Sequence, residues 1–161
     1  MKVTHIILPT VALVCNVSAA LPAQENVEKE FITVTKALFT SDPATLIKHS
    51  HPKFRKFVGG DAKFAQIMKS GCAYMKNAQV KFVSAKVKKQ TALFKANNDQ
   101  YFFIQTNITI SSAGNETSND EIYLVIKSNE DSPWSYLKVA DKQLPTLKQL
   151  FPKVDFTKAQ M

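Results

Sequence analysis

Residues 100–111 read QYFFIQTNITIS, and this stretch decides the fold because apolar and polar side chains alternate along it. A period of two is typical of a β-strand that buries one face. The face predicted to lie in the core carries Phe102, Ile104, Thr106, Ile108 and Ile110. The opposite face carries Tyr101, Phe103, Gln105, Asn107 and Thr109. The stretch therefore predicts one long strand that packs its first face against the core.

Shorter stretches on either side show strand-like patterns and predict a single antiparallel sheet. They cover residues 80–87, 91–95, 121–127 and 134–140. A polar loop is predicted at residues 112–120, between the long strand and the next one. In the strand after this loop, the side chains predicted to face inward are Ile122, Leu124 and Ile126.

Helical spacing replaces alternation before and after the sheet region. The first predicted helix covers residues 25–40, and its apolar stripe carries Val27, Phe31, Val34 and Leu38. Further helices are predicted at residues 43–49, 62–77 and 145–151. The chain therefore predicts an α+β fold with N-terminal helices packed on the sheet and a short C-terminal helix.

A glycine pair, Gly59-Gly60, precedes the helix predicted at residues 62–77. Glycine adopts positive φ at little cost, whereas a residue with a Cβ resists it. The pair therefore predicts a tight turn between two helices, and Asp61 is predicted to cap the second of them.

Residues 1–20 have the layout of a secretory signal peptide, with a positively charged start, a mostly apolar run and small residues up to Ala20. Cleavage there leaves residues 21–161 as a single domain. The mature protein is therefore expected to be exported, to the periplasm or out of the cell. No apolar run approaches the ~20 residues of a transmembrane helix.

The net charge of +8 is unevenly placed, with eight lysines and no acid over residues 62–98. Such a patch indicates either an anionic partner or lysines that keep a sheet edge from pairing with other chains. Arg55 is the only arginine, and arginine is the usual residue for bidentate phosphate contacts. Nucleic acid is therefore not an expected partner.

Metal-ligand and catalytic patterns are weak in this sequence. Cys72 is the one cysteine after the predicted cleavage, so no internal disulfide is expected. His49 and His51 could form a metal pair completed by Asp42, or they could end a helix and start a turn. No third ligand lies at a recognised spacing, so we expect no metal, no cofactor and no catalytic residue.

Three short blocks of sequence resemble those of a group of small exported bacterial proteins. The first block is HPKF at residues 51–54 followed by FVGG at residues 57–60. The second is YLVIKS at residues 123–128 followed by WSYL at residues 134–137, and the third is LKQLFP at residues 147–152. That group belongs to the nuclear transport factor 2-like superfamily, which has a cystatin-like α+β roll.

The resemblance implies a roll with a conical cavity between the N-terminal helices and the curved sheet. Some members of the superfamily carry out acid–base chemistry in that cavity. Asp131-Ser132-Pro133 replaces the glycine-containing hairpin turn of the group, which is a departure from its pattern. The group has no established activity, so the resemblance assigns no functional residue.

The leading hypothesis is an exported, non-catalytic binding or interaction module, with a small apolar ligand in the cone or a protein on the open sheet face. A homodimer paired through the sheet is also expected from such a face. The candidate cavity residues are Tyr74, Phe102, Ile104, Tyr123, Trp134 and Tyr136.

Two alternatives remain. One is an enzyme of the isomerase, dehydratase or hydrolase kind, which would need an inward-facing acid or histidine within reach of a tyrosine. The other is an envelope-surface protein that binds anionic polymer through strand lysines such as Lys86, Lys88 and Lys89.

Overall fold

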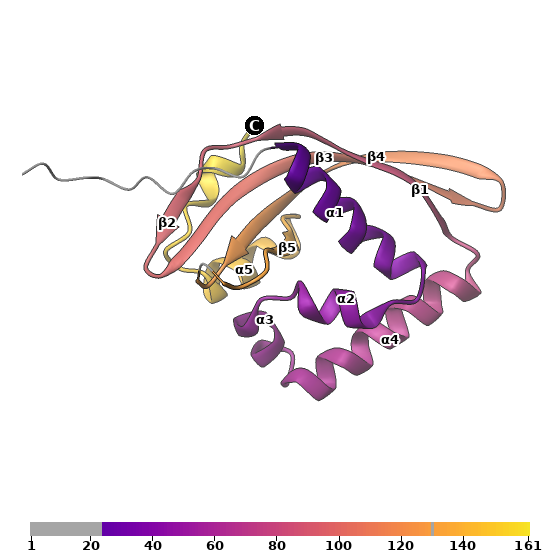
Figure 1. Ribbon diagram of the computed structural model, residues 1–161, viewed down its shortest axis with the longest axis horizontal. Coiled ribbons are helices and arrows are strands. Elements are labelled where there is room, and N and C mark those ends of the chain that lie inside the picture. Colours follow the sequence, from indigo (N-terminus) through magenta and orange to yellow (C-terminus); the bar gives the residue numbers. More distant parts are fainter. Residues whose placement is uncertain (1–23, 130) are drawn as a thin grey trace, which may run out of the picture.

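The computed structural model describes residues 24–129 and 131–161, and these residues form an α+β fold. Helices come first, a curved antiparallel sheet follows, and a short helix lies near the C-terminus (Figure 1). The predicted signal peptide, residues 1–20, lies outside the described residues. Within the described ranges, no helix is both long and apolar enough to cross a membrane.

The sheet is built around the long strand that the alternating pattern predicts. This strand, β3 (Asp99–Ser112), pairs along one side with β1 (Lys81–Gln90) and β2 (Phe94–Ala96). Its other side pairs with β4 (Asn115–Lys127), which in turn pairs with β5 (Ser135–Lys138). All pairings are antiparallel, so the prediction of a single antiparallel sheet is confirmed.

The polar loop predicted at residues 112–120 is wrong, because β4 begins at Asn115. Ala113 and Gly114 alone make the turn, with φ of 50° and 83°. Positive φ at both central residues is typical of tight hairpin turns whose twist matches that of the strands. Polar side chains pair across this hairpin, including the Thr109 and Ser118 hydroxyls at 2.7 Å. Because residues 115–121 of β4 are polar on both faces, the sequence carries no alternation there to reveal the start of this strand.

The N-terminal helices are α1 (Gln24–Phe39), α2 (Pro43–Lys48), α3 (Pro52–Phe57) and α4 (Asp61–Asn77). The sequence predicts three of them and misses α3, which has only six residues. Helix α1 lies along β1, and α4 packs on α1 and α2 away from the strands (Figure 1). After the sheet come α5 (Leu144–Leu150) and a 3-10 turn at Phe156–Ala159.

The turn between α3 and α4 confirms the glycine prediction. Gly59 and Gly60 have φ of 107° and 93°, in the region that residues with a Cβ rarely adopt. Gly60, not Asp61, is the residue that precedes α4, so the cap prediction is wrong. Asp61 instead begins the helix and accepts a hydrogen bond of 2.7 Å from Nε of Arg55.

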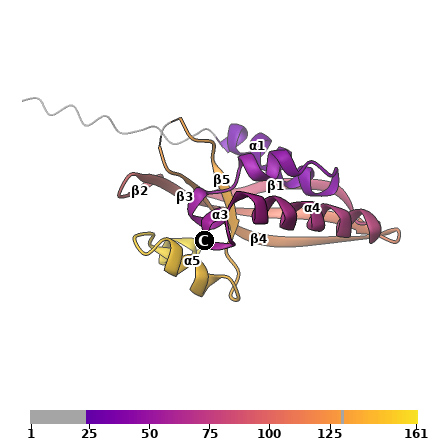
Figure 2. The ribbon, with the colours of Figure 1, turned by 90° about the horizontal axis from the view of Figure 1, so that it is seen from below.

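The sheet is buried on both faces where β3, β4 and β5 meet. Phe102 and Ile104 lie in a core with α1, and Tyr101 and Phe103 lie in a second core with α5 and the C-terminal segment. Figure 2 shows α1 and α5 on opposite sides of the strands. One half of β3 is therefore enclosed from both sides.

This arrangement corrects one predicted face. Ile122, Leu124 and Ile126 were expected to share the core of Phe102, but Leu124 pairs opposite Phe103 and Ile126 opposite Tyr101. Cross-strand partners point to the same face of a sheet. The three residues therefore belong to the α5 core, whereas Val125 joins Phe102 in the α1 core.

Candidate functional site

A cavity of about 340 Å³ lies between the N-terminal helices and the end of the sheet. All four of these helices contribute to its wall, together with β5 and the segment from Lys142 into α5. Its apolar side chains include Val34, Leu46, Phe54, Phe64, Met68 and Leu147. The volume falls in the range of small-molecule sites, and an apolar wall with a few polar groups is their usual composition.

His49 is a polar group of this wall, and its ring is held from one side. Nδ1 lies 3.0 Å from the main-chain oxygen of Trp134 and 3.2 Å from Oε1 of Glu30. Both of these oxygens are acceptors, which assigns the proton of the neutral ring to Nδ1. The hydrogen bond with Glu30 raises the pKa of His49 above its ordinary value, even though burial acts in the opposite direction.

Tyr136 lies next to His49 in the cavity wall, with ring centroids 6.4 Å apart. Its Oη is buried and has no hydrogen-bond partner among the described residues. Burial, and then the charge of Glu30, raise the pKa of Tyr136, so its hydroxyl stays protonated. A buried hydroxyl without a partner costs stability and is a ready donor for any acceptor that comes within reach.

Positive charge gathers at the β5 and α5 side of the cavity. Lys138 and Lys142 both line the cavity and are exposed. Lys138 also donates to the Glu121 carboxylate. Gln143 and Thr146 add further hydrogen-bonding side chains beside Lys142. The polar part of the cavity is therefore rich in donors.

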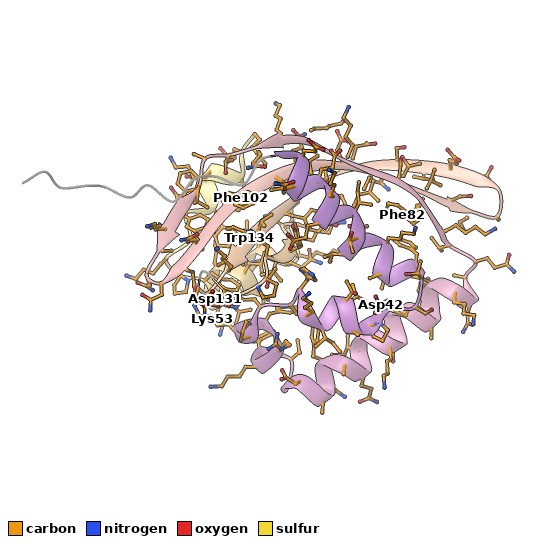
Figure 3. The ribbon with its side chains drawn as sticks, in the orientation of Figure 1. Asp42, Lys53, Phe82, Phe102, Asp131 and Trp134 are labelled. Atoms are coloured by element: carbon orange, nitrogen blue, oxygen red, sulfur yellow. The ribbon has the colours of Figure 1, made fainter. Side chains whose placement is uncertain are left out.

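Of the six cavity residues suggested by the sequence, Tyr136 lines this cavity. Trp134 contributes its main-chain oxygen to His49, while its ring packs edge-on against Phe102 with centroids 5.0 Å apart (Figure 3). Phe102 and Ile104 are fully enclosed in the α1 core, with no exposed surface.

The remaining two suggested residues lie apart from the cavity wall. Tyr123 packs edge-on against Phe31 and donates to Glu121 Oε2 over 2.6 Å. Tyr74 is 67% exposed on α4. The structure therefore brings Phe102, Ile104, Tyr123, Trp134 and Tyr136 together on one side of the sheet and leaves Tyr74 outside.

His51, two residues from His49, occupies a different site. Its side chain is buried at 1% exposure, and its Nδ1 accepts the main-chain N–H of Lys53 over 3.2 Å. Nε2 therefore carries the proton and donates to Ser128 Oγ, 2.8 Å away. Burial lowers the pKa of His51 to about 4. This tautomer cannot take a proton from Ser128, so the pair is a structural link and not an activated nucleophile.

The sequence did not predict the pairing of Glu30 with His49, because the two residues belong to different helices. One signal existed: Glu30 is four residues before Val34, so both lie on the same face of α1. A carboxylate on the apolar stripe of a helix needs a partner once that stripe is covered. His49 supplies the partner.

No family model matches this chain, and no curated protein matches it. The side chains around the cavity are therefore the basis for a functional proposal. They comprise a large apolar wall, a histidine held by a carboxylate, a tyrosine hydroxyl without a partner, and two lysines.

Proposed function

We propose that this protein is an exported binding module of the nuclear transport factor 2-like kind, which holds a small, mostly apolar molecule in the cavity. The observation that supports it is the cavity of about 340 Å³, whose wall is largely apolar and carries a few convergent polar groups. The order of N-terminal helices followed by a curved antiparallel sheet is consistent with the roll.

Binding would draw its free energy mainly from apolar surface. Each buried Å² of such surface contributes roughly 25 cal/mol, and the cavity offers side chains from α5 and all four N-terminal helices to cover a ligand. The polar groups would fix the orientation of the ligand, as they do in most small-molecule sites.

The test uses phenylnaphthylamine, an uncharged dye that fluoresces strongly in apolar surroundings. Met68→Trp should fill the cavity, because Met68 lines it from α4. Met75→Trp is the matched control, since Met75 is also a half-buried methionine of α4 but does not line the cavity. We expect dye affinity to fall about tenfold or more in the first variant and little in the second. Equal affinity in wild type and Met68→Trp would contradict a ligand in this cavity.

A second candidate function is acid–base catalysis, which the Glu30, His49 and Tyr136 cluster favours. A histidine oriented by a carboxylate beside a tyrosine hydroxyl has the composition of a general acid–base pair. Nitrobenzisoxazole is a small apolar probe that opens when a base removes its ring proton. A base in the cavity should open it about a hundredfold faster in wild type than in His49→Gln. Equal rates would remove this candidate.

A further inference from the structure

The cavity presents donors and positive charge to a ligand, and little negative charge. His49 lines the cavity, whereas Glu30, the carboxylate that holds it, does not. The Glu121 carboxylate is occupied by Tyr123 and Lys138. The polar groups left for a ligand are thus mainly His49, Tyr136, Lys142, Gln143 and Thr146.

We propose that the bound molecule is an amphipathic carboxylic acid, held as its carboxylate at His49 with its apolar body against the helices. This inference rests on the proposed binding function and names the chemical class of the ligand. An apolar wall with a cationic end matches a molecule that has one charged head and an aliphatic or aromatic body.

The His49 ring is fixed in the orientation that this role needs. Both of its contacts, to Trp134 and Glu30, are made by Nδ1, which leaves Nε2 for the ligand. When the ring is protonated, Nε2–H donates to a carboxylate, and a hydrogen bond between two charged groups is about twice as strong as a neutral one. The hydrogen bond to Glu30 favours this protonated form by raising the pKa of His49.

Tyr136 supports the same class of ligand. Its buried Oη lacks an acceptor among the described residues, and the ring lies beside that of His49. A carboxylate has two oxygens that together accept several hydrogen bonds. Because this Oη has no exposed surface, a head group held at His49 would supply the missing acceptor only with a small shift of the Tyr136 side chain.

The charged groups around His49 set the pH dependence. Glu30 faces it from α1, Lys48 adjoins it on the chain, and Lys138 and Lys142 line the cavity from the β5 side. Histidine is the side chain whose ordinary pKa lies near neutral pH, so His49 is the group expected to change its charge there. A carboxylate ligand should therefore bind best below the raised pKa of His49 and lose affinity as pH rises through it.

Octanoate and octanol provide the test, because they have the same apolar chain and different head groups. Titration of wild-type protein followed by NMR should show octanoate binding about tenfold tighter than octanol at pH 6, the effect of one charge-assisted hydrogen bond. At pH 9 the preference should shrink. The pKa of His49, read from its ring protons, should rise with octanoate and stay constant with octanol, and this measurement needs no variant.

Substitutions localise the head group. His49→Gln should remove most of the preference for octanoate and keep octanol binding. Lys142→Gln should weaken octanoate binding about twofold to threefold, whereas its matched control Lys76→Gln, an exposed lysine on α4, should change nothing.

The outcomes separate the two proposals. If octanol binds and octanoate binds no tighter, or if octanoate shifts only surface lysines, the acid proposal is overturned and the binding function stands. If neither molecule binds in the cavity, the proposed function fails and the acid proposal fails with it.

Discussion

His49 and His51 are two residues apart, yet the protein uses them in opposite ways. His49 lies in the wall of a cavity and pairs with a carboxylate, which raises its pKa. His51 is sealed in the interior between Lys53 and Ser128, where burial lowers its pKa to about 4. The same side chain is thus poised to carry charge at one position and kept neutral at the other.

The difference follows from the position of each histidine, because His49 ends one helix and His51 starts the next. His49 follows the last residue of α2, so its ring can turn back toward α1 and β5. His51 precedes α3, and its Nδ1 satisfies a main-chain N–H of that helix. Residue type and spacing in the sequence are therefore a poor guide to the role of a histidine, and hydrogen-bond partners decide it.

The largest expected effect is the loss of the buried histidine. His51→Ala removes the cap of α3, the bond to Ser128 and the edge-on contact with Phe151, whose ring centroid is 4.9 Å away. It should lower the free energy of unfolding by about 3 kcal/mol, whereas His49→Ala should cost about 1 kcal/mol. Urea denaturation of both variants measures the contrast, and equal losses would end the distinction between the two sites.

The next effect is a loss of stability in acid. The folded state binds a proton at His51 only near pH 4, whereas the unfolded chain binds one near pH 6.5. The stability contributed by neutral His51 is therefore complete above pH 6.5 and is lost as pH falls towards 4. From pH 7 to pH 4.5, wild type should lose about 2 kcal/mol more than His51→Asn, which does not titrate. If the free energy of unfolding fell equally with pH in the two proteins, His51 would not be the source of the acid sensitivity.

A smaller loss of stability is expected from a substitution in the glycine turn that follows α3. Gly60 has φ of 93°, and a Cβ there would meet no atom within 4 Å, so Gly60→Val costs only backbone strain. We expect a loss of about 1 kcal/mol or more in the free energy of unfolding. Gly71→Ala is the matched control, because Gly71 lies inside α4 and an added Cβ would make an ordinary contact with Leu38. The control should be neutral or stabilising by about 0.5 kcal/mol.

The smallest expected effect is a loss of stability as pH rises, and it is caused by His49. Because its folded pKa is raised, its contribution to stability is present below pH 6.5 and is lost as pH rises through the folded value. The change should be under about 1 kcal/mol, since the pair with Glu30 is partly exposed. Glu30→Gln should lower the pKa of His49 seen by NMR and leave that of His51 unchanged. An unchanged His49 titration would show that Glu30 does not set it.

Much of the fold could be predicted because its signals are local. Alternation in β3 and the apolar stripe of α1 each lie within one element, and both are confirmed by the buried Phe102 and Phe31. Alternation gives two faces, however, and does not say which layer covers each. Leu124 was assigned to the wrong layer for that reason, since the second core is supplied by α5 and the C-terminal segment.

The candidate site was harder to predict, because its parts come from distant segments. Glu30, His49 and Tyr136 belong to α1, the end of α2 and β5, and no spacing links them in sequence. The ion pairs of the strand lysines were equally hard to predict, because their partners are distant in sequence. Lys88 donates to both oxygens of Asp120 over 2.8 Å, although 32 positions separate the two residues in the sequence.

The enclosure of one half of β3 has a consequence for how the backbone exchanges its amide hydrogens with solvent. Near Phe102 and Phe103, layers on both sides must separate before water reaches the strand, so exchange there should require unfolding of the whole domain. Past Thr109 the strand runs into an exposed hairpin tip that can open by itself. One continuous strand should thus hold both the slowest and some of the fastest protons in the molecule.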